Sequence, residues 1–177
     1  MRSTRQSAAG EVELRPLLQS DLAEVIAIER RAYRTPWSLA MFVLELSKRD
    51  TLGLAARAAG GLRGYVICSR YDRDWHLMTL AVDVPYQRRG IGRALLRELI
   101  ERLEDAHLVG AIAEPRITLE VRRSNLAAQR LYAAHGFLEA GVRPGYYAAD
   151  GEDALILWRT RATLRGETSD IPGLGCP

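Results

Sequence analysis

Apolar residues along this chain recur with the two-residue period of strands in some segments and with a helical period of about 3.6 residues in others. Strand-like alternation covers residues 11–17, 52–59, 62–71, 75–84, 116–121, 137–147 and 153–159. In the fifth of these segments, Ile117, Leu119 and Val121 fall on one face, as expected for a half-buried strand. The pair Gly60-Gly61, between the second and third segments, predicts a hairpin.

Four segments show helical spacing instead. They cover residues 20–33, 38–47, 90–105 and 124–136, with Ser20, Ser38 and either Ser124 or Asn125 as the expected caps. Serine and asparagine favour this position because their side chains accept hydrogen bonds from the first free N–H groups of a helix. Strands that are mixed with helices, several of them adjacent in sequence, predict a mixed α/β fold: a mostly antiparallel sheet flanked by helices.

The length of 177 residues is enough for one ordinary domain with a hydrophobic core. Residues 1–10 are small and polar, and residues 161–177 contain glycines and prolines without an apolar period. We therefore expect a domain over residues 11–160 with a flexible tail on either side. No segment resembles a signal peptide or a membrane span, so a membrane partner is not expected.

Composition narrows the possible functions only slightly. Hydrophobic residues at 47% and charged residues at 27% are typical of a globular domain, and the net charge of +3 suits either an anionic cofactor or nucleic acid. Three scattered histidines and two distant cysteines predict neither a metal site nor a disulfide framework. The cysteine usage favours a reducing, cytoplasmic setting. No RNA-binding signature is found, so direct nucleic-acid binding is not expected.

The segment QRRGIGRAL lies between a predicted strand and a predicted helix. A helix N-terminus carries free N–H groups and a partial positive charge, and Gly90 and Gly92 would let an anion approach them closely. The side chains of Arg88, Arg89 and Arg93 add positive charge. The predicted ligand is a phosphate or pyrophosphate that is held mainly by main-chain groups.

Spacing excludes two other glycine-rich motifs. A P-loop needs lysine and then serine or threonine after its last glycine, but Gly92 is followed by Arg93 and Ala94. A dinucleotide fingerprint needs a third small residue where Leu95 stands. Taken alone, the segment could still be a helix that begins with glycines and surface arginines.

Three motifs in the same order identify the chain as similar to a known family. The pattern [Gln/Arg]-x-x-Gly-x-[Gly/Ala] at residues 87–92 resembles the acetyl-coenzyme A signature of the GCN5-related N-acetyltransferases (GNAT). The segments LAVD at residues 80–83 and LEVRRSNLAAQRLYAAHGF at residues 119–137 match that family as well. The resemblance covers roughly residues 11–160 and implies the GNAT fold, with acetyl-coenzyme A as co-substrate and no metal.

The segment GYYAADGEDALILW at residues 145–158 narrows the resemblance to enzymes that acetylate N-terminal amines. It resembles the bacterial ribosomal-protein alanine N-acetyltransferases and their archaeal relatives. This implies a protein or peptide N-terminus as acceptor, on a small-subunit ribosomal protein, and a monomer or weak dimer. Acetylation of lysine side chains, polyamines or small amines stays an alternative, as does a coenzyme-binding module without catalysis. Thr79 and Pro144 depart from the pattern of the bacterial ribosomal-protein alanine N-acetyltransferases. This departure concerns the peptide specificity that the resemblance implies, not acetyl transfer itself.

The resemblance also implies roles for individual residues. Glu120 matches the general base of the family, and Tyr132 matches the general acid. The positions that match coenzyme contacts are Leu80, Ala81, Val82, Arg88, Arg89, Gly90, Ile91, Gly92, Arg93 and Asn125. Tyr146 and Tyr147 match tyrosines that line the substrate groove.

Each of these residues also has a purely structural interpretation. Glu120 in isolation is typical of a solvated residue on a strand edge, and Tyr132 of a core residue with its hydroxyl at the rim. Asn125 could serve only as a helix cap, and the tyrosine pair at residues 146–147 only as strand packing. His76 begins a predicted strand without a visible partner.

Overall fold

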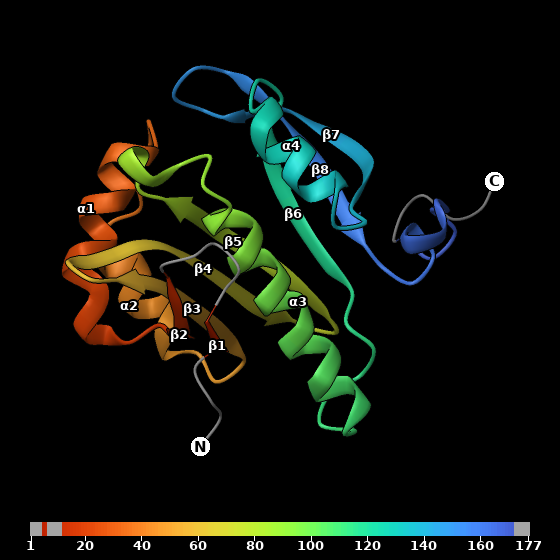
Figure 1. Cartoon of the computed structure of the whole chain (residues 1–177). Helices are drawn as coiled ribbons and strands as arrows, with labels where there is room; N and C mark the ends of the chain where they lie inside the picture. Colours follow the sequence, from red (N-terminus) through yellow and green to blue (C-terminus); the bar gives the residue numbers. More distant parts are fainter. Residues whose placement is uncertain (1–4, 7–11, 172–177) are drawn as a thin grey trace. The chain divides into compact units, whose positions relative to one another are not determined.

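The computed structural model describes residues 5–6 and 12–171, and it confirms the predicted α/β fold (Figure 1). The strands are β1 (Arg5–Gln6), β2 (Glu13–Pro16), β3 (Thr51–Ala58), β4 (Gly61–Tyr71), β5 (Asp74–Val82), β6 (Ile117–Arg122), β7 (Leu138–Tyr147) and β8 (Glu152–Arg159). The helices are α1 (Leu22–Ala32), α2 (Leu39–Ser47), α3 (Ile91–Leu108) and α4 (Leu126–Ala133). Short 3-10 turns are η1 (Gln19–Asp21), η2 (Val84–Tyr86) and η3 (Thr163–Arg165).

The chain divides into two compact units. The first contains the chain up to Arg70 together with Leu77–Ala111, and the second contains Tyr71–His76 together with the chain from Ile112 onward. Strand β5 contributes its first three residues to the second unit and its remaining residues to the first.

The strands of the first unit follow the order β1-β2-β3-β4-β5. Strand β3 runs antiparallel to both β2 and β4. The predicted hairpin is confirmed, because β3 ends at Ala58 and β4 begins at Gly61. Gly60 has φ +87° and Gly61 has φ +123°, a backbone region that favours glycine, so the sequence at this turn follows from its geometry.

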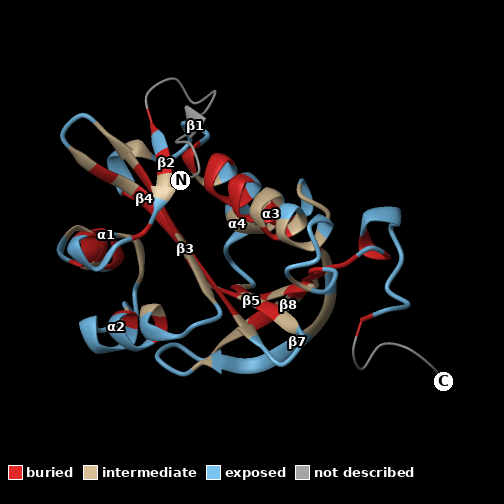
Figure 2. Cartoon of the chain, turned by 90° about the horizontal axis from the view of Figure 1, so that it is seen from below, coloured by how far each residue is buried: buried red, intermediate tan, exposed pale blue. Residues whose placement is uncertain are grey.

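Helices cover both faces of the sheet in the first unit, with α1 and α2 on one side and α3 on the other (Figure 2). Ala55 of β3 packs in one core cluster with Val25, Ile28 and Phe42 of the first two helices. Its neighbour Leu54 is also fully buried and faces the opposite side, because successive strand residues alternate. Each large apolar side chain buried in this way stabilises the fold by about 2 kcal/mol.

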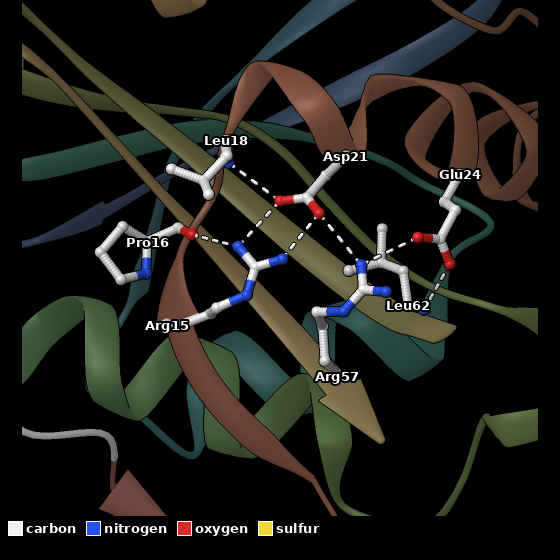
Figure 3. Close-up of polar contacts among 7 residues, drawn as sticks. All are labelled: Arg15, Pro16, Leu18, Asp21, Glu24, Arg57 and Leu62. Carbon is white, nitrogen blue, oxygen red and sulfur yellow. Dashed lines mark hydrogen bonds and ion pairs between the residues drawn. The ribbon is translucent and has the colours of Figure 1, made fainter. Parts of the chain in front are cut away.

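The carboxylate of Asp21 fixes the start of α1. The prediction that Ser20 caps this helix is therefore wrong. A 3-10 turn precedes the helix, and its last residue, Asp21, is buried and charged. The Asp21 carboxylate accepts hydrogen bonds from Leu18 N–H at 2.9 Å, from two nitrogens of Arg15 at 2.6 and 2.9 Å, and from Arg57 at 3.0 Å (Figure 3). Charge-assisted bonds of this kind are stronger than those of a serine hydroxyl.

The second unit holds the start of β5 and strands β6, β8 and β7, in that order. Strand β6 runs parallel to the start of β5, with His76 opposite Thr118, and antiparallel to β8, with Glu120 opposite Ile156. The predicted alternation in β6 is confirmed, since its apolar residues are buried. Strands β7 and β8 form an antiparallel pair.

The structure differs from the expectation of a loose C-terminal tail over residues 161–171. The Thr160 hydroxyl donates a hydrogen bond to Asp170 at 2.6 Å, and the Thr163 hydroxyl donates one to the carbonyl of Gly136 at 2.8 Å. Ile171 is buried. The remaining tail residues, 172–177, lie outside the described part of the chain, as do most of residues 1–10. Between residues 12 and 171, no helix is long and apolar enough to cross a membrane.

The Asp21 contacts predict a pH-dependent contribution to stability. Burial alone would raise the pKa of Asp21, but the hydrogen bonds from Arg15 and from Leu18 N–H outweigh it and hold the pKa below the usual 3.8. Asp21→Asn is expected to lower the free energy of unfolding near neutral pH by about 2 kcal/mol. Because the folded-state pKa is depressed, this contribution is present above the unfolded-state pKa and is lost as the pH falls through the folded-state value.

Urea unfolding at neutral and acid pH measures this effect. Asp50→Asn is the matched control, because Asp50 pairs with Arg70 on the exposed surface and its loss should change stability little. An Asp21→Asn protein as stable as the parent at neutral pH would contradict the role given to this carboxylate.

Candidate active site

The end of β5 carries the residues predicted to pair with the coenzyme through their main chain. Ala81 is buried, while Leu80 and Val82 are half-buried. The Leu80 carbonyl accepts a hydrogen bond from the Tyr33 hydroxyl at 2.6 Å, and the Val82 carbonyl accepts one from Gln87 Nε2 at 3.1 Å. Each of these carbonyls already accepts one hydrogen bond, so a donor group of the coenzyme would have to use the second lone pair of the same oxygen.

The predicted anion-binding loop connects β5 to α3. Asp83 leads into it, and its buried carboxylate accepts a hydrogen bond from Arg31 Nε at 2.8 Å. Arg88 has φ +63° and Gly90 has φ +82°, so the loop turns through the left-handed region twice. Gly90 is the N-cap of α3, and no side chain of the described residues caps this helix. The first N–H groups of α3 are therefore not covered by a side-chain acceptor.

The arginines of this loop lie on the surface. Arg88, Arg89 and Arg93 are exposed, while Ile91 is buried and anchors the first turn of α3. The Arg89 guanidinium lies 5.4 Å from the centre of the Tyr86 ring. Together with the positive end of α3, these side chains create a local field that favours a phosphate group.

Glu120 lies on β6 in the second unit, and its side chain is only 7% exposed. Its Oε2 lies 2.8 Å from His76 Nε2, and its Oε1 lies 3.3 Å from a terminal nitrogen of Arg143. Strand β6 is paired on both sides, with the start of β5 and with β8. The interpretation of Glu120 as a solvated edge residue is therefore wrong, and so is the expectation that His76 has no partner.

The surroundings of Glu120 favour its ionised form. Burial alone would raise the pKa of this carboxyl, but the hydrogen bond from His76 and the charges of His76 and Arg143 outweigh it and hold the pKa below its usual range. Glu120 is therefore a carboxylate at neutral pH, shielded from water and in contact with two nitrogen donors. Such a group can accept a proton from a substrate within hydrogen-bond reach.

Tyr132 and Asn125 both belong to α4. Tyr132 is buried and packs against the ring of Phe137, with 5.6 Å between the ring centres. Asn125 is the N-cap of the helix, and its side-chain oxygen accepts a hydrogen bond from Ala128 N–H at 3.1 Å. Of the two predicted caps, the structure selects Asn125. Both residues thus have a structural contact besides the role that the family resemblance implies.

Tyr146 and Tyr147 form the end of β7, with their rings edge to face and 5.2 Å apart. Tyr146 is exposed, and its pKa is raised by partial burial and by the negative charge of Glu120. Burial raises the pKa of Tyr147 to about 12, even though the guanidinium of Arg122 lies 3.9 Å from its ring centre. The Arg143 guanidinium contacts Glu120 and lies 5.6 Å from the centre of the Tyr146 ring, so Glu120, His76, Arg143 and Tyr146 form one cluster, called here the Glu120 cluster.

The residues that the structure describes contain no group of three histidine, cysteine, aspartate or glutamate side chains that could hold a metal ion. The Glu120 cluster offers a buried carboxylate that can accept a proton, and the loop before α3 offers free main-chain N–H groups beside exposed arginines.

Residues 22–137 match the Acetyltransferase (GNAT) family. The chain belongs to this family. The resemblance seen in the three motifs is thereby confirmed, and the protein is an N-acetyltransferase.

Similar proteins include several N-acetyltransferases. The ribosomal protein bS18-alanine N-acetyltransferase of Escherichia coli (strain K12) is 39% identical over 140 residues, which are 78% of this chain and 90% of that protein. The N-alpha-acetyltransferase RimI of Mycobacterium tuberculosis is 39% identical over 128 residues, 70% of this chain and 75% of that one. The crystal structure of the ribosomal-protein-S18-alanine N-acetyltransferase from Escherichia coli gives a TM-score of 0.73 at 37% identity, covering 83% of this chain and 92% of that chain.

Three residues of this region were missed by sequence reasoning: His76, Arg143 and Tyr33. A signal for His76 was available, because the alternation of β5 places it on the same half-buried face as Leu80. Arg143 directly precedes Pro144, one of the two positions at which the sequence departs from the pattern of the resembled enzymes. Tyr33 is the C-cap of α1, and nothing in the sequence indicates that its hydroxyl donates a hydrogen bond to the Leu80 carbonyl.

The close packing of β4 against β5 predicts a strict requirement for Gly64. A Cβ atom at this position would lie 2.7 Å from the carbonyl oxygen of Ala81, a backbone atom of the predicted coenzyme-binding segment. Gly64→Ala is therefore expected to destabilise the protein by about 1–3 kcal/mol, because the two strands cannot separate without loss of packing. Thermal unfolding measures the change.

Gly141→Ala is the matched control for this substitution. Its Cβ would meet only the Ile156 side chain, at an ordinary contact distance of 3.8 Å. This variant should unfold near the temperature of the parent protein. Equal stability of the Gly64 and Gly141 variants would show that β4 and β5 are less closely packed than described.

Proposed function

We propose that this chain is an acetyl-coenzyme A-dependent N-terminal α-amine acetyltransferase, and that its acceptor is the N-terminal alanine of a small-subunit ribosomal protein. The observation that carries the proposal is the 39% identity to the Escherichia coli ribosomal protein bS18-alanine N-acetyltransferase, 90% of which is covered. The buried, ionised Glu120 supports it, because an enzyme of this kind needs a proton acceptor. A ribosomal acceptor would place the enzyme in the cytoplasm.

The loop before α3 fits the pyrophosphate of acetyl-coenzyme A. Glycine at the N-cap, the absence of a side-chain cap among the described residues and three exposed arginines together suit an anion. The residues that would hold the coenzyme are Leu80, Ala81, Val82, Arg88, Arg89, Gly90, Ile91, Gly92, Arg93 and Asn125. Bound there, the coenzyme supplies an acetyl thioester that is activated for attack by an amine.

The acceptor amine must lose a proton before it forms the amide bond. A free α-amine has a pKa of about 8, so a useful fraction is neutral at neutral pH, whereas a lysine amine with a pKa of about 10.4 needs more help. Glu120 would accept the amine proton, directly or through a water molecule. Its depressed pKa keeps the carboxylate ready to do so across the neutral range. Tyr146 and Tyr147 would flank the entering peptide.

The remaining steps concern the carbonyl oxygen and the sulfur of the thioester. A main-chain N–H of Leu80–Val82 would hydrogen-bond the carbonyl oxygen as negative charge develops on it. The Tyr132 hydroxyl would give its proton to the departing thiolate. The acetyl group would pass directly to the amine, without an acyl-enzyme intermediate on Cys68. This cysteine is fully buried, and burial raises the pKa of its thiol, so the thiol is a poor nucleophile.

The assigned roles predict a separation of catalysis from coenzyme binding. Glu120→Gln and Tyr132→Phe are each expected to lower kcat/KM for an alanine-starting peptide by about a hundredfold, because each removes one proton transfer. Coenzyme affinity measured by calorimetry should stay near that of the parent. Glu139→Gln, a change to an exposed glutamate of β7, is the matched control and should leave the rate unchanged. Parent rates in both substituted enzymes would refute the assigned roles.

The acceptor class can be tested with a peptide library. A peptide with a free N-terminal alanine should be acetylated, whereas the same peptide with a blocked N-terminus and an internal lysine should not. Mass spectrometry locates the added acetyl group, and peptides with other N-terminal residues measure the preference for alanine. Acetylation confined to lysine or to small amines would favour the alternative acceptors and overturn the N-terminal assignment.

A further inference from the structure

Tyr33 contacts the predicted coenzyme segment, but the proposed mechanism gives it no role. Its hydroxyl donates a hydrogen bond to the Leu80 carbonyl at 2.6 Å. The same hydroxyl oxygen accepts a hydrogen bond from Thr79 Oγ1 at 3.3 Å. All three residues belong to the first unit. The sequence ties the departure at Thr79 to peptide specificity only, whereas the bond to Tyr33 connects Thr79 to the coenzyme segment as well.

The alternation of β5 decides which of its main-chain groups can reach a ligand. Directly after β5, Asp83 N–H donates a hydrogen bond to a main-chain carbonyl of β4 at 2.8 Å. The Ala81 carbonyl points to the same neighbour, because its oxygen would lie 2.7 Å from a Cβ atom at Gly64. In a strand, the N–H and C=O of one residue point to the same edge, and successive residues alternate between the two edges. Leu80 therefore directs both of its groups away from β4, and so does Val82.

The two main-chain groups of Leu80 have opposite effects on a bound thioester. The Leu80 N–H can donate to the thioester carbonyl oxygen, whereas the Ala81 N–H faces β4. The Leu80 carbonyl lies on the same edge as its N–H, and its partial negative charge opposes the negative charge that develops on the thioester oxygen during acetyl transfer. The hydroxyl of Tyr33 offsets part of this partial charge and fixes the direction of the carbonyl.

We propose that Tyr33 is a positioning residue for acetyl transfer: its hydroxyl holds the Leu80 main chain so that the Leu80 N–H polarises the thioester carbonyl of acetyl-coenzyme A. The proposal rests on the proposed function, because it requires that the thioester binds along Leu80–Val82. It narrows the N–H donor from the three residues of that segment to one. It also adds a side chain that neither the three motifs nor the family resemblance identifies.

A buried glutamate fixes the place of Tyr33 at the end of α1. Glu29 is 2% exposed, and its main-chain carbonyl accepts a hydrogen bond from Tyr33 N–H at 3.0 Å. Its carboxylate accepts one from Trp37 N–H at 3.0 Å and another from the Tyr65 hydroxyl of β4. Glu29 therefore holds both ends of the segment from Tyr33 to Trp37. The Tyr33 hydroxyl is thus set in place before the coenzyme binds, as a preorganised donor requires.

Thr79 supports the same hydroxyl from β5 itself. Thr79 is buried, and its Oγ1 donates to the Tyr33 oxygen. A hydroxyl that accepts a hydrogen bond becomes a stronger donor, because hydrogen bonds in a chain polarise one another. Thr79 therefore acts on the Leu80 carbonyl through Tyr33 and not by a contact of its own.

Infrared spectroscopy of acetyl-coenzyme A labelled with carbon-13 at the acetyl carbonyl tests the proposal without an acceptor. A hydrogen bond to the thioester oxygen lowers the carbonyl stretching frequency, so the coenzyme bound to the parent protein should absorb below the free coenzyme. Tyr33→Phe removes only the hydroxyl and should move the band toward that of the free coenzyme. The same variant should lower kcat for an alanine-starting peptide by about tenfold, while the coenzyme Kd from calorimetry stays within about twofold of the parent value.

Thr79→Val examines the second hydrogen bond. It should lower kcat by about threefold, because Tyr33 still donates to the Leu80 carbonyl but is a weaker donor. Since Thr79 acts through Tyr33, the double variant should be no slower than Tyr33→Phe alone. Losses that multiply in the double variant would contradict this arrangement.

Ser47→Ala is the matched control, because it also removes a hydroxyl that donates to a main-chain carbonyl, that of Leu44, at 2.8 Å on the exposed side of α2. It should leave the band and kcat as in the parent. Should Tyr33→Phe fail to fold, the band and the rate of Thr79→Val decide instead.

The proposal is overturned if the parent shows the band of the free coenzyme, or if a folded Tyr33→Phe protein shows the parent band. A loss of kcat that is matched by an equal loss of coenzyme affinity would also overturn it, because Tyr33 would then only support the fold of the site. A parent protein that shows the lowered band but acetylates no alanine-starting peptide would refute the proposed acceptor and leave the role of Tyr33 standing.

Discussion

A carboxylate removed from water must be paired, and the pairing of Glu120 is the constraint on which the proposed chemistry depends. An unpaired buried charge costs several kcal/mol, so Glu120 would take up a proton and lose its basicity if its partners were absent. His76 and Arg143 supply the missing interactions from two different strands. The ionised state of the base is therefore a property of the sheet, not of the glutamate alone.

The parallel pairing of β6 with the start of β5 produces this arrangement. The other neighbouring pairs described with a register are antiparallel, so this pair brings together segments that are far apart in the chain. In the first unit, the end of the same strand leads into the glycine-rich start of α3. Strand β5 therefore carries a contact to the proposed base, Glu120, at its start and the predicted coenzyme segment at its end.

Local patterns were enough to predict the elements and the family, while contacts between distant segments were not predictable. Alternation located the strands, and the cap at Ser38 and the hairpin at Gly60-Gly61 follow from local rules that the structure confirms. The cap at Ser20 was wrong because Arg57, from a strand far along the chain, makes Asp21 the better anchor. The partner of Glu120 was missed for the same reason: register between β5 and β6 depends on tertiary packing, not on either segment alone.

The central claim is that Glu120 is held as a carboxylate by its neighbours and so can serve as the base. The most direct test is a carbon-13 NMR titration of protein labelled at its glutamate carboxyl carbons, with the Glu120 signal assigned by its absence in Glu120→Gln. The account predicts a titration midpoint below that of an ordinary glutamate in the parent protein. A midpoint above the ordinary value, showing that burial outweighs the His76 and Arg143 contacts, would contradict it.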